Sequence, residues 1–571
     1  MVQSAPDDAD ADAVAVTEAP TPRDTSARVV RRRLGYAGLA GALIFCCLSL
    51  TPSLLPRGAL LQGAISGVTA VIGYGLGALA GAVVAHFVKR QPSARTRKIA
   101  ARVLIFVGIP ALVLFGRLGA VWQRDLRLLM GMEPLDTRDG LLIMTVAILV
   151  FALLLLIARA IRLGTRTLVR LFLRFLPRPV AYAAGVTASV VILVGFVQGF
   201  LLSSFVDVAN EASSLANGGT TEGIEQPALA TLSGSPRSLI PWDSLGLKGR
   251  DFAGSASTKA EIATFNGRPA LDPIRVYAGL ESADSYQEQA RLAVREMDRT
   301  GAFDRAVIAV ITTTGTGWID ENVADSLEYM YGGDTALVGM QYSYLPSWIS
   351  FLVDKSKATQ ASEALVGEIR ARWSGMPAAT RPKLVVFGES LGSYGTETAF
   401  DSVGNLTAQT DGALLVGPPF DNPIWQGLTD DREAGSAVWR PVVDQGRTVR
   451  FAQNPADLRT PASAWNRPRV VYLQNASDPI TWWSPRLLLR SPEWLDHPRG
   501  PDVTDDMRFY PVITFWQVTA DLAFSNGVPA GHGHRYGSNV VEGWAALLTP
   551  PEWSADDSVS LKAILDARQD D

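Results

Sequence analysis

The first 206 residues contain five apolar segments, each long enough to cross a membrane. They occupy residues 34–55, 59–88, 101–121, 140–158 and 180–206. A helix needs roughly 20 consecutive apolar residues to span the hydrocarbon core of a bilayer. A single segment near the N-terminus can be a secretory signal, but this first segment is too long and four others follow it. The sequence therefore predicts an all-α transmembrane domain of five spans over residues 34–206.

The charges between these segments predict how the domain is oriented. Basic residues gather before the first segment and in the loops after the second and fourth: Arg28, Arg31, Arg32, Arg33, Lys89, Arg90, Arg95, Arg97, Lys98, Arg159, Arg162, Arg166, Arg170, Arg174 and Arg178. The other two loops carry only Arg57 or a balance of basic and acidic residues. Loops rich in Lys and Arg stay in the cytoplasm. We therefore expect the N-terminus inside, and everything after residue 206 outside the plasma membrane, because the number of spans is odd.

Small residues recur along two of the predicted spans. Gly73, Gly77 and Gly81 are spaced by four residues in the second, and Gly195 and Gly199 repeat that spacing in the fifth. Small residues on one helix face let membrane helices approach closely. We expect these faces to be helix contacts.

The composition changes on both sides of the membrane domain. Residues 1–33 begin with a stretch rich in Ala, Asp, Thr and Pro that predicts a disordered cytoplasmic tail. Residues 207–255 are rich in Gly, Ser, Thr and Pro and are expected to be a linker. Residues 256–571 follow as a catalytic domain.

Short β-rich runs alternate with helical patterns in this last part of the chain. The predicted strands are Ile274–Tyr277, Ala306–Thr312, Ala336–Tyr342, Leu384–Phe387, Ala413–Val416 and Val470–Leu473. Helices are expected near 284–299, 321–331, 357–373 and 393–402. Strands that alternate with helices favour a mostly parallel sheet covered on both faces.

One pentapeptide in this region indicates chemistry. The predicted strand that ends at Phe387 runs directly into Gly388-Glu-Ser-Leu-Gly392. A Gly-x-Ser-x-Gly sequence between a strand and a helix is typical of a nucleophile elbow, where a sharp turn exposes the serine hydroxyl. The bland alternative is an ordinary structural turn. We interpret Ser390 as a candidate nucleophile.

A serine nucleophile needs a base, and the base needs a carboxylate that orients it. Asp478 follows the last predicted strand, a position where a carboxylate at the carboxyl end of the sheet can face the site. As an alternative, Asp478 is only a turn residue before Pro479.

The chain has four histidines, and His532 and His534 lie latest, in the Gly-rich stretch Gly531–Gly537. Either can be the base, and the sequence leaves this open; they can also be plain loop residues or a metal pair. Zinc requires three or four ligands, and His497 lies in a Pro-rich loop whereas His86 lies in a membrane segment. We expect neither a metal nor a cofactor.

The same reaction needs donors for the developing oxyanion. The N–H of Leu391, directly after the candidate nucleophile, is one expected donor. The second is expected from the Gly/Thr loop after the strand that ends at Thr312, from Thr316 or, alternatively, Thr314. This loop can also be a simple turn.

About fifty residues separate Asp478 from the late histidines, and they are rich in aromatic side chains, Trp482 and Trp483 among them. A lid over an apolar acyl pocket would need such residues, and so would docking on a bilayer surface. Equally, they can belong to the core or pack against the membrane domain. We treat Trp482 and Trp483 as candidate substrate-binding residues and residues 480–530 as a candidate lid.

These motifs together resemble the α/β-hydrolase superfamily over about residues 270–550. The Gly-Thr loop, the single elbow, the Ser-Asp-Pro turn and the late His-x-Tyr look somewhat like cutinases. The five spans with Gly-Glu-Ser-Leu-Gly-Ser and Gly-His-Gly-His-Arg-Tyr-Gly resemble a family of actinobacterial membrane-anchored α/β hydrolases. The chain departs from cutinases in its membrane domain, in the long insertion, and in its cysteines, because Cys46 and Cys47 are adjacent in an apolar segment. Cutinase specificity is therefore not implied.

The sequence thus predicts a membrane-anchored serine hydrolase that cleaves an ester through an acyl-enzyme, and the expected substrate is a lipid or cell-envelope acyl ester. The alternatives are an acyltransferase that uses the same triad and a non-catalytic membrane scaffold or binding protein. Membrane lipids are the expected partners. A net charge of only −4 gives no basic field for nucleic acid.

Overall fold

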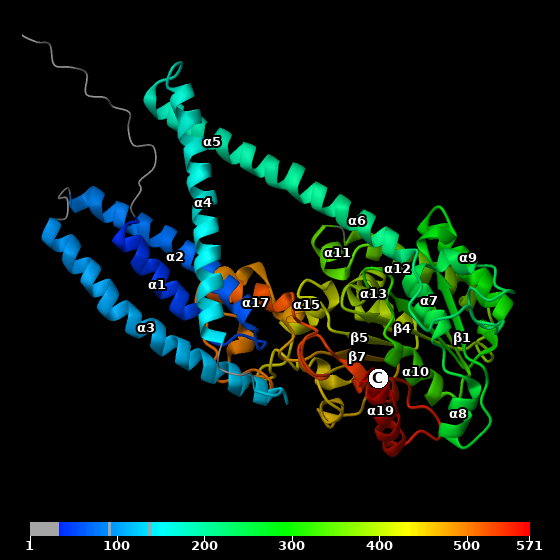
Figure 1. Ribbon diagram of the computed structural model, residues 1–571. Coiled ribbons are helices and arrows are strands. Elements are labelled where there is room, and N and C mark those ends of the chain that lie inside the picture. The colour runs from blue at the N-terminus through cyan, green and yellow to red at the C-terminus, as the bar shows by residue number, and fades with distance from the viewer. Residues whose placement is uncertain (1–33, 89–92, 135–138, 354, 571) are drawn as a thin grey trace, which may run out of the picture.

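The computed structural model describes residues 34–88, 93–134, 139–353 and 355–570. The predicted tail, residues 1–33, lies outside them. Figure 1 shows the N-terminal helices on one side and an α/β domain on the other, and the chain passes between the two through one long helix.

The membrane region consists of α1 (Tyr36–Ser49), α2 (Ala59–Val88), α3 (Ala94–Leu129), α4 (Gly140–Phe172), α5 (Arg178–Phe196), the π-helical turn η2 (Val197–Leu202) and α6 (Ser203–Asn217). Four helices among the described residues are long and apolar enough to cross a membrane: α2, α3, α4 and the continuous helix Arg178–Asn217. The prediction of five spans is therefore wrong by one, and the exception is α1.

The first apolar segment forms a helix of only 14 residues, about 21 Å at 1.5 Å per residue. The helix stops because Pro52 and Pro56 follow, and proline neither donates a backbone hydrogen bond nor tolerates a helical residue before it. Leu54 and Leu55, which the sequence assigned to the span, lie outside the helix and are fully buried against the α/β domain.

Glycines on α2 bring the neighbouring helices close, as their spacing predicted. A Cβ atom at Gly73 would lie 2.4 Å from the carbonyl oxygen of Gly41 on α1, and one at Gly77 would lie 2.3 Å from that of Ala37. The expectation for Gly195 and Gly199 is not met, because a Cβ atom there would have no described atom within 4 Å.

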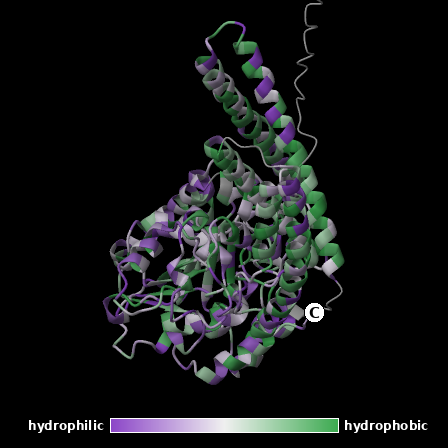
Figure 2. Ribbon diagram, turned by 90° about the vertical axis from the view of Figure 1, so that its left-hand side faces the viewer, coloured by the Kyte–Doolittle hydropathy of each residue, from purple (hydrophilic) through white to green (hydrophobic). Residues whose placement is uncertain are grey.

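The two ends of the membrane region differ in what they face. The α1–α2 turn and the C-terminal end of α3 pack into the core of the α/β domain, and the α4–α5 turn lies at the opposite end, where Figure 2 shows hydrophilic residues along the tips of otherwise hydrophobic helices. The basic residues from Arg159 to Arg178 belong to that remote end.

The α/β domain is built on a seven-stranded, entirely parallel sheet. Its strands are β1 (Ile274–Ala278), β2 (Val307–Thr312), β3 (Thr335–Met340), β4 (Lys383–Glu389), β5 (Gly412–Val416), β6 (Val449–Ala452) and β7 (Arg469–Leu473), in the order β1-β3-β2-β4-β5-β7-β6. All six predicted strands are present. The sequence missed β6, which has four residues and lies at the edge of the sheet.

Helices cover both faces of the sheet, which is why its strands are buried on both sides. The helices after α6 are α7 (Gly246–Gly254), α8 (Lys259–Asn266), α9 (Tyr286–Thr300), α10 (Glu321–Met330), α11 (Ser347–Val353), α12 (Ser356–Ser374), α13 (Leu391–Phe400), α14 (Val403–Gln409), α15 (Pro423–Asp430), α16 (Pro479–Trp482), α17 (Ile513–Leu522), α18 (Val540–Leu548) and α19 (Ala555–Asp570). One layer contains α9, α12 and α13, and the other contains α10, α18 and α19.

Residues 207–255, expected as a linker, begin as the end of the long helix and then pack on the first strand. Leu232 forms a parallel bridge with Arg275 on β1, and Ile240 and Leu245 are fully buried. This stretch therefore extends the α/β domain at the β1 edge.

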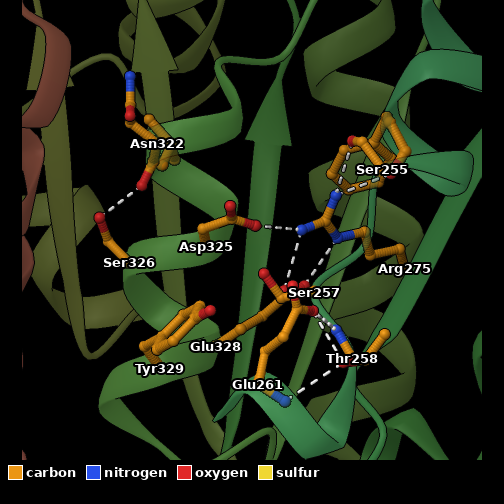
Figure 3. Close-up of polar contacts among 12 residues, drawn as sticks. Ser255, Ser257, Thr258, Glu261, Arg275, Asn322, Asp325, Ser326, Glu328 and Tyr329 are labelled. Atoms are coloured by element: carbon orange, nitrogen blue, oxygen red, sulfur yellow. Dashed lines mark hydrogen bonds and ion pairs between the residues drawn. The ribbon is translucent and has the colours of Figure 1, made fainter. Parts of the chain in front are cut away.

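A buried ion cluster fastens this edge. Arg275 on β1 donates from Nε and Nη2 to both oxygens of Glu328 at 2.7 and 2.9 Å, and from Nη2 to Asp325 at 2.7 Å. Its Nη1 donates to the carbonyl of Phe252 at 2.9 Å. Figure 3 shows the guanidinium pointing between the carboxylates of α10. Burial alone would lower the pKa of Arg275, but the carboxylates outweigh it and raise that pKa above the usual range.

Candidate active site

Ser390 lies in a strained turn between β4 and α13. Its backbone has φ 52° and ψ −125°, a positive φ that a non-glycine residue seldom adopts. The N–H of Ser390 donates to the carbonyl of Val416 at the end of the neighbouring strand β5, 2.8 Å away. Strain of this kind persists only where the surroundings enforce it, and it gathers at functional sites.

The two glycines of the elbow are required by space. A Cβ atom at Gly388 would lie 2.4 Å from the carbonyl oxygen of Gly392, and a Cβ atom at Gly392 would lie 2.2 Å from that of Thr312. Both positions are closed to any side chain. The sequence-based interpretation of the pentapeptide as an elbow therefore matches its geometry.

Asp478 lies just after β7 and is completely buried. One carboxylate oxygen accepts from the N–H of Ile480 at 2.8 Å and thereby caps α16. The other accepts from the hydroxyl of Tyr536 at 2.8 Å and lies 2.7 Å from Nδ1 of His534. A buried carboxylate in contact with Nδ1 fixes the imidazole and leaves Nε2 for a substrate or nucleophile.

His534 is placed next to the elbow by strand β5. A Cβ atom at Gly417 would lie 2.6 Å from Cε1 of His534 and 2.9 Å from its Nδ1. Gly417 follows Val416, whose carbonyl holds the amide of Ser390. The imidazole and the serine thus flank consecutive residues at the end of one strand.

His532 belongs to a second pair. Its Nδ1 lies 3.1 Å from Oδ2 of Asp502, which also accepts from the hydroxyl of Ser477. That hydroxyl in turn accepts from the N–H of Gly533 at 2.8 Å. The sequence left His532 and His534 open as bases, and the structure places only His534 on Asp478. Tyr536 and Asp502 were not assigned roles from the sequence, although the His-x-Tyr spacing contained a signal for the tyrosine.

The Gly/Thr loop after β2 lies at the elbow and contacts it through the first residues of the loop. The carbonyl oxygens of Thr312 and Thr313 lie 2.2 and 3.2 Å from a Cβ atom at Gly392. The N–H of Thr314 is already bonded to the carbonyl of Trp318 at 3.2 Å, and the carbonyl of Thr316 accepts from Gln341 at 2.9 Å. The N–H of Leu391, in the first turn of α13, has no acceptor within the helix.

The two candidate substrate-binding tryptophans differ. Trp482 is 4% exposed, donates from its indole N–H to the carbonyl of Asn475 at 3.1 Å and packs on Trp425, so its place is in the core. Trp483 joins an aromatic cluster with Phe420 and Phe515, at centroid distances of 5.3 and 5.8 Å. Only Trp483 faces other rings near the surface of the domain.

Glu389 directly precedes the nucleophile and is buried. Burial, reinforced by the nearby carboxylates of Asp320 and Asp478, raises the pKa of Glu389 well above its usual range. The raised pKa favours the neutral form of the Glu389 carboxyl, which lessens charge repulsion with Asp478.

The strand order, the elbow on β4 and the carboxylate after β7 define an α/β hydrolase with an additional membrane region. Residues 274–561 match the family described as "Alpha/beta-hydrolase family", and residues 50–256 match the one described as "Alpha/beta-hydrolase family N-terminus". The chain belongs to this α/β-hydrolase family. No curated protein and no solved structure matches the chain.

Proposed function

We propose that the protein is a membrane-embedded serine hydrolase that cleaves a lipid or envelope ester with Ser390, His534 and Asp478. The observation that carries the proposal is the 2.7 Å contact between His534 Nδ1 and the buried Asp478, with the imidazole packed beside the strand end that holds the Ser390 amide. His534, rather than His532, is the proposed base.

In the first step, Ser390 Oγ attacks the carbonyl carbon of the ester while His534 Nε2 takes the hydroxyl proton. Asp478 stabilises the imidazolium that forms. The oxyanion is stabilised by the N–H of Leu391 and by a second backbone donor from the Thr312–Gly317 loop, where Thr316 was the residue predicted. The tetrahedral intermediate then collapses, the alcohol leaves with the proton from His534, and an acyl-serine remains.

In the second step, water attacks the acyl-serine and gives its proton to His534. Collapse releases the carboxylic acid and returns the proton to Ser390. If an alcohol takes the place of water, the same residues carry out acyl transfer, so the acceptor decides between hydrolase and acyltransferase.

A lipid substrate is supported by the surface around the site. The segments after β3, β5 and β7 contain α11, α15 and α17, which Figure 1 shows on the side of the α/β domain that faces the membrane helices. On α11, Trp348 is 57% exposed and lies 6.3 Å from the ring of Phe205 on the long helix. Exposed aromatic residues beside a membrane helix favour the bilayer interface.

The proposed orientation puts the catalytic domain outside the plasma membrane. This orientation rests on the position of the basic residues and not on the number of spans. The basic residues of the first turn of α3 and of the α4–α5 turn lie at the end of the membrane region that is remote from the α/β domain. Basic ends stay cytoplasmic, so the opposite end, with the α/β domain, lies outside.

The test is labelling of membranes with a fluorophosphonate probe, which reacts with activated serines. We expect the wild type to be labelled, and Ser390→Ala, His534→Ala and Asp478→Asn to lose labelling by a factor of about 10³ or more. His532→Ala serves as the matched control and should keep most of the signal.

Loss of labelling in His532→Ala with retention in His534→Ala would overturn the assignment of the base. A folded wild type that no fluorophosphonate labels would instead favour the non-catalytic binding protein. Hydrolysis of short and long acyl esters in micelles, with and without an added alcohol, then separates hydrolysis from acyl transfer.

A further inference from the structure

The turn between α1 and α2, residues 50–58, is buried in the α/β domain, and we call it the docking loop. Leu54 and Leu55 belong to the main hydrophobic core of that domain and are 0% and 1% exposed. A segment that only linked two membrane helices would lie in solvent or at the lipid surface. The docking loop is therefore part of the fold of the catalytic domain.

Helix α17 holds the docking loop through polar contacts. Asp521 accepts from the hydroxyl of Ser53 at 3.0 Å and from the backbone N–H groups of Leu54 and Leu55 at 3.1 and 3.4 Å. Gln517, one turn earlier, donates to the carbonyls of Ser49 and Thr51 at 3.2 and 2.8 Å. These bonds are all buried, so water does not compete for them.

The same helix leads directly to the proposed base. Three residues after α17, the carbonyl of Ser525 accepts from the N–H of His534 at 2.8 Å. Gly533, between the two histidines, is enclosed by this segment and by the docking loop: a Cβ atom there would lie 2.5 Å from Ser525 O, 2.7 Å from Val528 Cγ2 and 3.3 Å from Leu55 Cδ2. Leu55 therefore forms one wall of the histidine loop (residues 531–537).

We propose that the docking loop positions the histidine loop, through Leu55 and through the hydrogen bonds between the docking loop and α17. The membrane domain then contributes to the geometry of the active site in addition to anchoring it. Leu55 and Gln517 are positioning residues in this proposal, because neither touches the reacting atoms. The proposal rests on the proposed function for its catalytic consequence, and on the packing alone for its structural one.

An anchor and a positioning element make different predictions for a soluble substrate. If the membrane domain only localises the enzyme, shortening Leu55 leaves the reaction with a small water-soluble ester unchanged. If it positions His534, the same change lowers kcat and leaves KM unchanged, because the base moves while the substrate contacts stay. A displacement of about 1 Å at a reacting group costs on the order of 10²-fold in rate.

The experiment uses the full chain in detergent micelles and compares Leu55→Ala, Leu55→Met and Gln517→Ala with the wild type. Leu60→Ala is the matched control, because Leu60 lies in the first turn of α2, directly after the docking loop, but is 64% exposed. Two readouts are taken: hydrogen–deuterium exchange of peptides covering residues 525–537, and the rates of fluorophosphonate labelling and of short-chain nitrophenyl ester hydrolysis.

We expect Leu55→Ala and Gln517→Ala to speed exchange in residues 525–537 and to slow labelling by about ten- to a hundredfold at unchanged KM. Leu55→Met, which refills the space, should restore both readouts, and Leu60→Ala should match the wild type. Unchanged exchange in a folded Leu55→Ala variant would overturn the proposal, as would a Leu60→Ala variant as impaired as Leu55→Ala.

The two readouts also separate this proposal from the proposed function. Faster exchange in Leu55→Ala, together with a wild type that no probe labels, would uphold the packing relation and reject the serine hydrolase. A labelled, active wild type whose exchange and rates ignore Leu55→Ala and Gln517→Ala would uphold the hydrolase and reject the positioning role.

Discussion

Arg275 and Arg57 are both buried beside carboxylates, yet their surroundings differ. Arg275 uses all three nitrogen atoms of its guanidinium within the α/β domain. Arg57, in the docking loop, donates from Nη2 to the carbonyl of Thr51 at 3.0 Å, but its Nε and Nη1 find no hydrogen-bond partner among the described residues. Its nearest approach to Asp521 is 3.9 Å.

The pKa directions reflect this difference. The pKa of Arg275 is raised because its carboxylates outweigh burial, whereas burial lowers the pKa of Arg57 and Asp521 compensates only in part. A buried charge with incomplete partners is poorly compensated for its lost hydration. The Arg275 cluster is therefore a fully hydrogen-bonded ion cluster within the α/β domain. The Arg57–Asp521 contact is a weaker ion pair between the docking loop and the α/β domain.

The largest loss of stability is expected at the Arg275 cluster, where every guanidinium nitrogen has a hydrogen-bond partner. Arg275→Met should lower the free energy of unfolding by about 3–5 kcal/mol, because it leaves the buried Glu328 without its ion-pair partner and Asp325 with Arg568 alone. Thermal unfolding in detergent micelles measures the loss. Arg372→Met is the control: Arg372 pairs with Asp298 on the surface, and such a pair contributes about 1 kcal/mol or less. Equal losses in both variants would contradict the distinction.

The same substitution at Arg57 should lower the free energy of unfolding less. Arg57→Met removes one bond to Thr51 and the cation 3.9 Å from Asp521, but it also removes two buried nitrogen atoms that lack partners, so we expect a smaller loss of about 1 kcal/mol. The same thermal unfolding experiment ranks it against Arg275→Met. A loss as large as that of Arg275→Met would show that the Arg57–Asp521 contact compensates the buried charge of Arg57 as well as the Arg275 cluster compensates that of Arg275.

The contribution of the Arg57–Asp521 contact to stability should depend on pH. Burial raises the pKa of Asp521 to about 6, although Arg57 and the bonds from the docking loop oppose the shift; an Asp in an unfolded chain titrates near 3.9. The folded state thus binds this proton more tightly, so its contribution to stability is complete below about pH 4 and is lost as the pH rises through about 6.

Asp521→Asn cannot titrate and should lack this loss. The unfolding temperature of wild type relative to Asp521→Asn should therefore fall between about pH 4 and about pH 6. A difference that is constant over this range, or that changes in the opposite direction, would be incompatible with the raised pKa.

The smallest effect is expected at Glu389, a buried carboxyl for which the described residues show no ion-pair partner. The raised pKa favours the neutral form of Glu389, and Glu389→Gln keeps that neutral form and the shape of the side chain. We expect changes within about 0.5 kcal/mol in unfolding free energy and less than about threefold in labelling rate. Glu389→Asp, which shifts the carboxyl, is the informative contrast.

Much of the candidate site could be proposed from the sequence because its signals are local. The elbow needs only a strand, two glycines that no side chain can replace and a serine between them, all within a few residues. Asp478 follows directly from its place after a strand in a parallel sheet. The choice between His532 and His534 was not local: it depends on which carboxylate each ring meets, and Asp502 lies 30 residues from His532.

The error in the predicted number of spans has a physical cause. The first apolar segment was counted as a span because Leu54 and Leu55 are hydrophobic, and hydrophobicity alone does not tell burial in lipid from burial in protein. Pro52 and Pro56 were the available signal for the end of the helix. The bond between Ser53 and Asp521 joins residues 468 apart, and no pattern along the chain indicates it.

The continuous helix Arg178–Asn217 has 40 residues, about 60 Å of stiff rod, and its far end enters the α/β domain at a place distinct from the docking loop. A body attached at two such points has less freedom to swing or to rise than one attached at a single point. If Ser390 acts on lipids as proposed, the two attachments restrict the height of the serine above the bilayer. The enzyme would then behave as a ruler that selects esters by their depth in the membrane.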